Sequence, residues 1–454
     1  MYISRLALDH FRSWDACVLD FDQGINILQG KNGLGKTNIV ESIEVLATGS
    51  SQRVTSTLPL IQRGSTTAVV RANVVEHADE KLRGSAGNDS HAAGASPTTL
   101  EMSIHARGAN RMRVNAGHSL MMKDVQGLVS CVSFTPQDQH LVTEDPAARR
   151  VFLNQAGMQL DGHYGEILQR TRHIAQQRVA LLKQLGRNGQ YHGEAFGQGF
   201  VSDDAGADAG ALSQSSQAAA LSGLEVWTGQ FIDAGVELTR RRKAVIDALN
   251  ETFPEIYQRL SGKPTLPDQA DAHLEYRPSF SEVLDQEHPH ESISAHFERI
   301  FKGEMARGFN LIGPQRDDVE FMLNGFPARE YASNGEQWTL AIALKMSLYQ
   351  ALVRERGSEP IIVLDDVFAQ LDEQRRAQII HFASQQHQVL ITVAAASDIP
   401  EFADAHIIDI QQVYDKNQYD STMFEAMIQA QAIHRPNEQP SGDEQIEGEA
   451  EASR

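Results

Sequence analysis

The hydrophobic pattern near the two ends of the chain is that of an α/β domain. Short, mainly apolar runs, typical of strands buried on both faces, occupy residues 25–28, 360–364 and 388–393. Apolar residues at helical spacing follow the first run at 37–47, and a second helical pattern at 374–384 separates the other two runs. Alternating strands and helices predict a parallel sheet covered by helices. Because the strands come from both ends of the chain, we predict one sheet assembled from two separated segments.

In the middle third, apolar residues recur instead every seven positions. The two series are Ile167, Ile174 and Leu181, and then Leu224, Phe231, Leu238 and Val245. This spacing predicts two helices that pair across an extended turn. Each series lasts only three or four heptads, so a compact helical lobe and a protruding coiled coil both remain open.

These patterns divide the chain into four segments. We predict the first half of an α/β head at 1–145, an inserted helical lobe at 146–304, the second half of the head at 305–415, and a C-terminal extension at 416–454. A bias toward Gly, Ser, Ala and acidic residues predicts disorder at 83–97, 186–223 and 436–454. The last of these stretches is an acidic tail.

Composition narrows the class of protein. A chain of 454 residues has room for two or three domains. Its two cysteines, Cys17 and Cys131, exclude a disulfide framework and a cysteine-based metal site. The absence of a signal-like segment and of any run of about 18 apolar residues predicts a soluble, cytoplasmic protein without a membrane partner. The formal net charge of -20 means that any contact with DNA must be local.

One motif predicts nucleotide binding. It is a phosphate-binding loop with the strand before it and the helix after it that such loops require, and it comprises Gly30, Lys31, Asn32, Gly33, Leu34, Gly35, Lys36 and Thr37, with Asn38 following. Its backbone N–H groups and the helix N-terminus would bind phosphate oxygens. Lys36 would contact the β- and γ-phosphates of ATP, and the Thr37 hydroxyl would bind Mg²⁺. A Gly-rich turn without a ligand is the simpler alternative.

A second motif ends the apolar strand at 361–364 with two acids, Asp365 and Asp366. A buried strand delivers such carboxylates to the edge of the sheet where phosphates bind. Asp365 would hold Mg²⁺, and Asp366 would polarise the water that attacks the γ-phosphate. Alone, such a strand end is usually a solvated turn, so the prediction depends on its pairing with the phosphate loop.

A third motif, Ser-Asn-Gly-Glu-Gln at 333–337, begins a helical pattern at 340–353 and offers a hydroxyl and N–H groups to an anion. The order of phosphate loop, Ser-x-Gly-x-Gln helix start, acid-tipped strand and Leu371-Asp372 resembles the head of an ABC-type ATPase. That resemblance implies an ATP-dependent homodimer in which Ser333 reaches the nucleotide of the partner subunit and Asp372 lies at the dimer seam.

Within ABC-type heads, the chain resembles the RecF family of bacterial recombination-repair proteins. The similar blocks are 2–6 with 11–12, 24–26, 46–49, 134–138 with 149–153, 313–318, 364–368 and 370–373. The resemblance implies a slow, DNA-stimulated ATPase that acts as a switch, dimerises on ATP and binds single-stranded and gapped DNA. It also implies RecR-type and RecO-type partners, loading of a RecA-type recombinase, and roles in DNA replication, DNA repair and the SOS response.

The resemblance also assigns further residues. Gln137 would sense the γ-phosphate, with Gln139 as an alternative. Two positions depart from the family pattern. Gln315 stands where the family has a His, and Asn334 is atypical within the signature, which is the motif at 333–337. After the last strand the chain has Thr392 and small residues where transporter-type heads place a His, so we expect slow hydrolysis.

Basic clusters predict where DNA would bind. The candidates are Arg149, Arg150, Arg240, Arg241 and Arg242, with further cations at Arg170, Arg172, Arg178 and Lys183. Merely solvated helix faces are an equal alternative. Aromatic residues do not alternate with these cations, as they would at a site that reads bases. We therefore expect sequence-independent phosphate contacts. Arg53 and Arg63 could reach either nucleotide or DNA.

Three other functions compete with this reading. An ABC transporter ATPase subunit would share the head, but the long insertion and the signature argue against it. A chromosome-structural protein of SMC type would need hundreds of heptad residues for its arms. A small-molecule kinase would need a substrate lid and an acceptor base, and the sequence shows neither.

Overall fold

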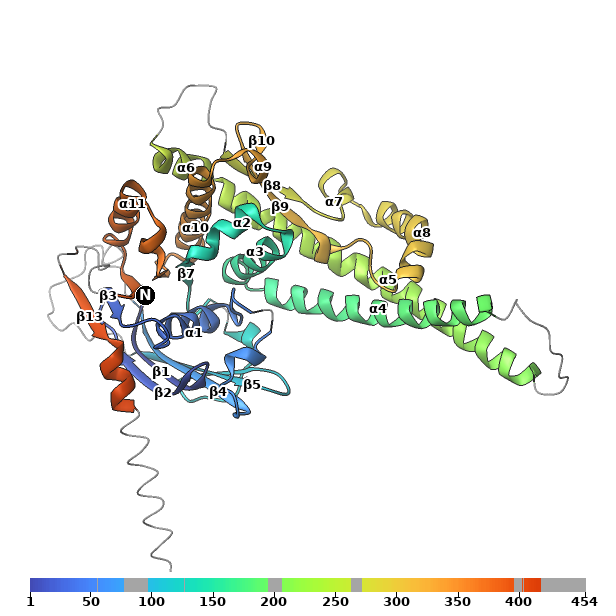
Figure 1. Ribbon diagram of the computed structural model, residues 1–454. Helices are drawn as coiled ribbons and strands as arrows, with labels where there is room; N and C mark the ends of the chain where they lie inside the picture. Colours follow the sequence, from blue (N-terminus) through green and yellow to red (C-terminus); the bar gives the residue numbers. More distant parts are fainter. Residues whose placement is uncertain are drawn as a thin grey trace, which may run out of the picture.

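The computed structural model describes residues 1–54, 56–76, 97–125, 127–194, 206–262, 272–395, 402 and 404–417. The chain folds into a head, which contains both chain ends of the described part, and a lobe from which two long helices project (Figure 1). Strands from the first and last parts of the chain lie side by side in the head, as the sequence predicts.

A five-stranded parallel sheet forms the centre of the head. Its strands are β3 (Gly24–Gln29), β7 (Cys131–Phe134), β11 (Ile361–Asp365), β12 (Gln388–Val393) and β13 (Ala405–Asp409). Their order is β13-β3-β12-β11-β7, and every neighbouring pair is parallel. Each of the two early strands therefore pairs only with late ones, which brings the ends of β3 and β11 close together.

Helices cover both faces of this sheet because its strands alternate between two cores. Ile27, Leu364 and Ile391 face a core shared with α10 (Asn334–Arg356) and α11 (Glu373–Ala383). Leu28 and Leu390 face the opposite core, which includes α1 (Lys36–Thr48). Gly49 ends α1 in the left-handed region at φ 71°, and its N–H bonds the Val45 carbonyl. The predicted helix and its stop are both confirmed.

A second sheet, which the sequence analysis does not predict, packs on the α1 side. It is antiparallel, in the order β2-β1-β4-β5-β6, with β1 (Tyr2–Phe11), β2 (Trp14–Asp20), β4 (Thr67–Val75), β5 (Thr98–His105) and β6 (Arg111–Val114). Its buried side chains, such as Leu6, Val70 and Met102, join Ile39 and Ile43 of α1 in one core.

The lobe contains the two predicted heptad helices, α4 (Tyr164–Glu194) and α5 (Gly206–Asn250), which pack against each other and project from the head (Figure 1). Six of the seven predicted seam residues are buried, and Leu181 is partly buried. Both helices continue into 186–223, so much of the predicted disordered insertion is helix. The pair is flanked by α3 (Pro146–Leu160) and α8 (His290–Arg307).

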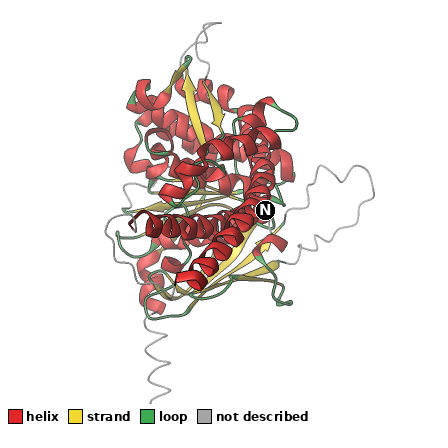
Figure 2. Cartoon of the chain, turned by 90° about the vertical axis from the view of Figure 1, so that its right-hand side faces the viewer, coloured by secondary structure: helices red, strands yellow, loops and turns green. Residues whose placement is uncertain are grey.

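The lobe is not purely helical, contrary to expectation. A three-stranded antiparallel sheet joins β8 (Ala272–Arg277), β9 (Asp318–Leu323) and β10 (Phe326–Pro327), and Figure 2 shows it apart from the strands of the head. Because β9 pairs with β8, residues 318–327 lie with the lobe although the sequence analysis places them in the head. The shorter elements are α2 (His140–Thr143), α6 (Phe253–Ser261), α7 (Glu282–Asp285), α9 (Ala328–Tyr331), η1 (Leu58–Leu60), η3 (Met122–Asp124), η4 (Pro136–Gln139), η5 (Pro314–Arg316) and η6 (Val367–Gln370).

Two predicted disordered stretches, 83–97 and 436–454, lie outside the described residues except for residue 97. Cys17 and Cys131 are buried free thiols. No helix in the described part of the chain is long and apolar enough to cross a bilayer.

Candidate nucleotide-binding site

The phosphate loop connects β3 to α1 and depends on glycine at two positions. Gly33 and Gly35 have φ of 89° and 88°, which L side chains rarely adopt. A Cβ on Gly35 would lie 2.6 Å from Nε1 of Trp14, whose indole donates a hydrogen bond to the Gly35 carbonyl at 3.2 Å. Only glycine therefore lets the loop pass under Trp14 and enter the helix.

Lys36 lies inside the curve of this loop. Its side chain is folded back, the residue is 4% exposed, and its Nζ donates to the carbonyls of Gly30 at 2.6 Å and Lys31 at 3.2 Å. The Asn32 side chain also accepts from it at 3.4 Å. These neutral acceptors hold the ammonium where a phosphate oxygen would be a stronger partner.

Thr37 and Asp365 meet although 328 residues separate them in sequence. The Thr37 hydroxyl donates to Oδ1 of Asp365 at 3.1 Å, and the Thr392 hydroxyl donates to the same oxygen at 2.6 Å. Burial at the end of β11 raises the pKa of Asp365, and the two hydroxyl groups act in the opposite direction. A hydroxyl and a carboxylate beside a phosphate loop are the oxygen donors that Mg²⁺ accepts, so these residues fit that ion.

Asp366 follows directly and has a left-handed backbone at φ 51°. Its N–H donates to the Thr392 hydroxyl at 3.0 Å. A non-glycine residue in this region costs about 1 kcal/mol or more and persists only where surrounding contacts impose it. The Thr392 hydroxyl thus donates to the Asp365 carboxylate and accepts from the Asp366 backbone N–H.

These residues share one cavity of about 350 Å³. It is lined by Asn32, Thr37, Arg53, Pro136, Gln137, Asp365, Asp366, Phe368, Thr392, Val393 and Ala394. Gln137 and Gln139 are separated here: Gln137 lines the cavity, whereas Gln139 donates to the side chains of Asn334 and Gln337. Of Arg53 and Arg63, which the sequence leaves open, only Arg53 lines this cavity.

A second cavity, of about 360 Å³, shares Thr37, Arg53, Gln137 and Asp365 with the first and extends beneath α1. Beside it, Lys345 of α10 forms a buried ion pair with Asp138 of η4, Nζ to Oδ1 3.1 Å. Burial raises the pKa of Glu44 to about 7, despite the nearby charge of Lys345. Sequence reasoning misses Glu44 and Lys345 because they lie within apolar helical patterns.

Ser333 lies away from the cavity of its own chain, at the exposed N-terminus of α10. It forms a capping box, in which its hydroxyl accepts from the Glu336 N–H and donates to the Glu336 carboxylate at 2.8 Å. Asp372 caps α11 and pairs with Arg375, which in turn donates to the Gly335 carbonyl at 3.0 Å. The two predicted interface residues are therefore linked to one another at the surface.

Two of the predicted DNA-binding arginines point inward, which corrects that prediction. Arg149 is 6% exposed and binds both carboxylate oxygens of Asp318, at 2.7 and 3.0 Å. Arg242 is 2% exposed and pairs with the buried Asp317 at 2.6 Å. Each guanidinium is neutralised inside the protein, because an unpaired charge there would be far more costly.

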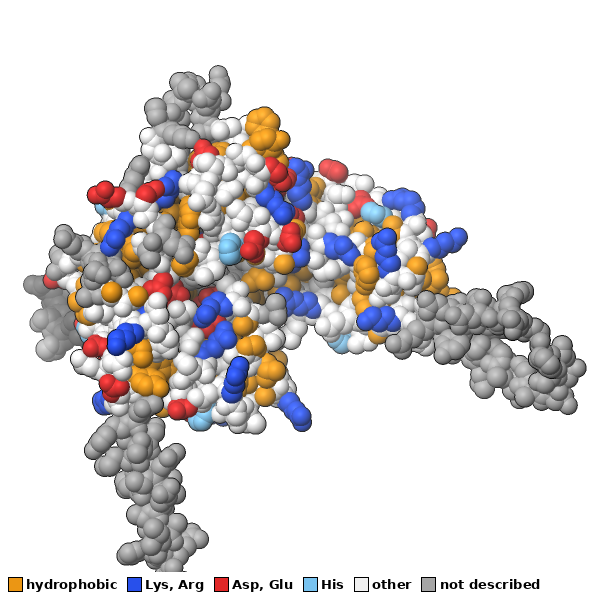
Figure 3. Space-filling view, viewed as in Figure 1, with side chains coloured by type: hydrophobic (Ala, Val, Ile, Leu, Met, Phe, Trp, Pro, Cys, Tyr) orange, Lys and Arg blue, Asp and Glu red, His pale blue; other side chains and the backbone are white. Residues whose placement is uncertain are grey.

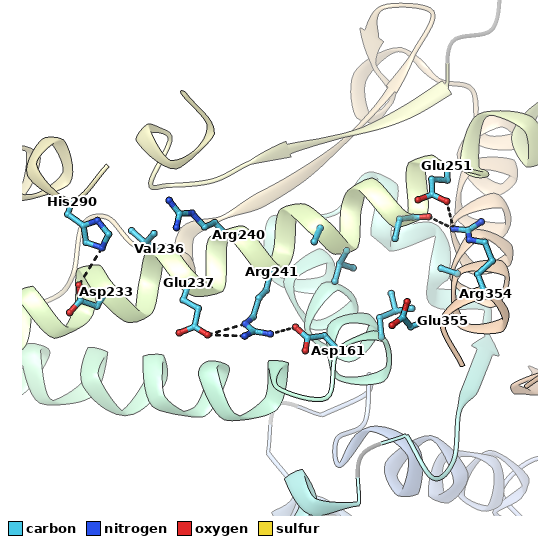
Figure 4. A pocket seen from close by; sticks show the side chains of 15 residues that line it. Asp161, Asp233, Val236, Glu237, Arg240, Arg241, Glu251, His290, Arg354 and Glu355 are labelled. Carbon is cyan, nitrogen blue, oxygen red and sulfur yellow. Dashed lines mark hydrogen bonds and ion pairs between the residues drawn. The ribbon is translucent and has the colours of Figure 1, made fainter. Parts of the chain in front are cut away.

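Arg240 and Arg241 line a groove of about 680 Å³ between α5 and the end of α10 (Figure 4). Arg241 binds Asp161 and Glu237, the latter at 3.0 Å. The other acids along this groove are Asp233, Glu251 and Glu355. The cations of this groove thus face at least as many carboxylates. Arg150, the fifth predicted arginine, lies on a different surface.

The fold and the site together define the head of an ABC-type P-loop ATPase. The family model described as RecF/RecN/SMC N terminal domain matches residues 2–417. The DNA replication and repair protein RecF of Bifidobacterium adolescentis is 55% identical over 410 residues, covering 90% of this chain and 91% of that protein. The corresponding protein of Beutenbergia cavernae is 33% identical over 432 residues, covering 90% and 98%. The chain belongs to the RecF family of DNA replication and repair proteins.

A solved structure supports the same fold. The recombination mediator protein RecF-ATP in the RecFOR pathway matches with a TM-score of 0.70 at 22% identity, covering 90% of this chain and 96% of that one. The predicted family and fold class are confirmed, and the transporter and SMC-type alternatives are not supported.

Proposed function

We propose that this protein is an ATP-driven switch in recombinational DNA repair. ATP and Mg²⁺ bind at the phosphate loop, two copies dimerise around the nucleotides, and the dimer binds single-stranded or gapped DNA. With RecR-type and RecO-type partners in the cytoplasm it helps load recombinase, and it serves the SOS response. Family membership supports this proposal, as does the naming of ATP and of the RecFOR pathway for the related solved structure.

The observation that carries the proposal is the meeting of Thr37 and Asp365, from opposite ends of the chain, on one cavity next to the phosphate loop that holds Lys36. The loop N–H groups and Lys36 would bind phosphates, together with the neighbouring loop residues and Asn38. Thr37 and Asp365 would hold Mg²⁺, which neutralises charge on the phosphates when bound.

Hydrolysis would be slow and would serve to reset the switch. Asp366 and Gln137 line the cavity beside Asp365 and would orient the attacking water. The hydroxyl of Thr392 already bonds to Asp365 and Asp366, so it has little capacity left to stabilise the transferring phosphoryl group. We expect DNA to stimulate turnover by improving the alignment of these groups.

The position of Ser333 supports the proposed dimer. Its hydroxyl and the N-terminus of α10 lie at the surface, outside the cavity that Thr37 and Asp365 line in the same chain. A second copy related by a two-fold axis would place this helix start over the γ-phosphate. Asp372, linked to the same helix start through Arg375, would lie beside it.

The test measures subunit mass by light scattering, with and without ATP and Mg²⁺, and DNA retention on gapped and fully duplex oligonucleotides. Lys36→Ala should lower ATP affinity roughly 10- to 100-fold, because a charge-assisted contact is lost. Ser333→Ala should retain ATP binding by the monomer but abolish the ATP-dependent dimer and the retention of gapped DNA.

Ser333→Ala also removes a helix cap, at a cost of about 1 kcal/mol. Ser333→Thr keeps the hydroxyl and the cap and is the matched control, which should dimerise. If the wild-type protein binds ATP but stays monomeric and does not bind gapped DNA, the nucleotide site is supported and the proposed role as a repair switch is wrong.

A further inference from the structure

A groove beside α4, one of the two projecting helices, is lined by cations and an aromatic side chain. It lies between α3, α4 and the segment leading into η5, has a volume of about 630 Å³, and is lined by Pro146, Arg150, Ala175, Gln176, Val179, Phe309, Asn310, Gln315 and Arg316. Among the residues that the structure describes, no Asp or Glu side chain lines it, although the formal net charge of the chain is -20. Its character is thus opposite to that of the molecule as a whole.

The two arginines of this groove are held in place but not neutralised. Arg150 donates to the Asp317 carbonyl at 2.9 Å, and Arg316 donates to the Asn310 carbonyl at 3.2 Å. Within the described ranges, neither guanidinium has a carboxylate oxygen within 4.0 Å. Neutral carbonyls therefore orient both groups and leave their positive charge available to an anion.

The same face of α4 extends this positive surface. Arg172 and Lys183 lie four residues before Gln176 and four residues after Val179, both are exposed, and Lys183 packs beside Gly308. Burial lowers the pKa of Arg150, and among the neighbouring charges Arg242 and Arg149 act in the same direction while Asp318 and Asp317 oppose them. Figure 3 shows Lys and Arg side chains spread over the lobe, where acidic ones are sparser.

Phe309 adds an apolar platform. The residue is 42% exposed, and the guanidinium of Arg316 lies over its ring at 5.6 Å from the centroid. An exposed aromatic ring beside cations is the arrangement on which bases of single strands stack, whereas the bases of a duplex are not available for stacking. Phosphate contacts and one stacked base together select a single strand.

We propose that this groove binds the single-stranded part of the DNA substrate, with phosphates on Arg150 and Arg316, a base on Phe309, and the strand continuing along α4 toward Lys183. This assignment depends on the proposed function, since it locates the DNA surface of the same switch. The alternative surface, the groove of Arg240 and Arg241, has carboxylates along it that would repel a phosphate backbone.

The first test compares two double variants of equal charge in the full chain with ATP and Mg²⁺. Arg150→Gln with Arg316→Gln should weaken binding of a fluorescent single-stranded oligonucleotide roughly tenfold near 0.1 M salt. It should also reduce the slope of log affinity against log salt by about 1.4, since each phosphate contact contributes about 0.7. Arg240→Gln with Lys243→Gln should bind as the wild type does.

The second test examines stacking. Phe309→Leu should weaken binding about fivefold or more without changing the salt slope, and Phe309→Tyr should restore it. An oligonucleotide with abasic sites should bind the wild type more weakly than an intact strand. The abasic and intact strands should differ less for Phe309→Leu, because the ring that distinguishes them is gone.

Unfolding temperature and ATP affinity are measured for every variant, so that loss of folding is not mistaken for loss of binding. If the wild type binds no DNA in the presence of ATP, the proposed function itself fails. If the wild type binds but the Arg150 and Arg316 double variant keeps its affinity and salt slope, the groove assignment is wrong. A loss confined to the Arg240 and Lys243 double variant would likewise overturn it and place DNA on α5.

Discussion

Individual charged residues show where sequence reasoning succeeds and where it stops. The positions of Lys36 and Thr37 at a helix start and of Asp365 at the end of a buried strand are predictable because local sequence patterns determine them, and their role in nucleotide binding stays a prediction. Arg149 and Arg242 are not predictable in this way, because only the folded lobe decides that Asp318 and Asp317 lie inside beside them. A basic residue in a helical pattern can equally be a surface cation or half of a buried pair.

Glu44 leads to a prediction about pH. Its pKa is raised to about 7 in the folded protein from 4.5, so the folded state holds the proton more tightly than the unfolded chain does. Stability should therefore fall as pH rises from about 4.5 to 7 and stay low above that range. The largest possible loss is about 3 kcal/mol.

Glu44→Gln should remove that loss. The variant keeps an acceptor for the Gln52 N–H and the Gln155 side chain, both of which bond Glu44 at 2.9 Å. Urea unfolding at pH 8 should show the variant more stable than the wild type, by up to about 3 kcal/mol, with the difference vanishing near pH 4. An equal difference at both pH values would contradict the raised pKa.

At the scale of elements, periodicity predicts those whose pattern is regular. The apolar runs of β11 and β12 and the helical spacing of α1 and α11 match the structure closely. By contrast, β1 loses its alternation where its pairing with β4 shifts between Ile3 and Arg5. β9 does alternate, with Val319, Phe321 and Leu323 buried, so the sequence carries the pattern of a strand. The sequence does not show that β8 is the strand with which it pairs.

Helix α10 connects the surface signature to the interior through Lys345. Lys345→Met would leave Asp138 and Glu44 without their positive neighbour and should lower the free energy of unfolding by about 3–5 kcal/mol. Adding Asp138→Asn should recover part of this loss, because the uncompensated charge disappears. Urea denaturation of the single and double variants measures both effects, and a loss below 1 kcal/mol for Lys345→Met would show that the pair is not a stabilising link.

At the scale of the whole molecule, the central sheet cannot be formed by either half of the head alone. The early strands β3 and β7 are not neighbours, and each pairs only with strands from residues 361–409. The sequence predicts a split head, but the strand order that makes the halves inseparable is visible only in the structure.

A chain divided into 1–194 and 206–454 should therefore regain function only when both pieces are present. Expressed together, the pieces should copurify and bind ATP, because β3 pairs with β12 and α4 packs on α5. Residues 1–194 alone should bind no ATP, since β11 and Asp365 are missing. ATP binding by that fragment, measured by calorimetry, would show that the late strands are dispensable.

The strand order also sets a delay during synthesis. Residue 29 at the end of β3 is complete long before residue 388 at the start of β12 is added. At roughly 5–20 residues per second, β3 waits about 20–70 s on the ribosome before β12 is available to pair with it. The unpaired backbone edges and apolar faces of β3 stay open to other chains throughout that interval, so the yield of folded protein should depend on translation speed and on chaperones that cover nascent strands.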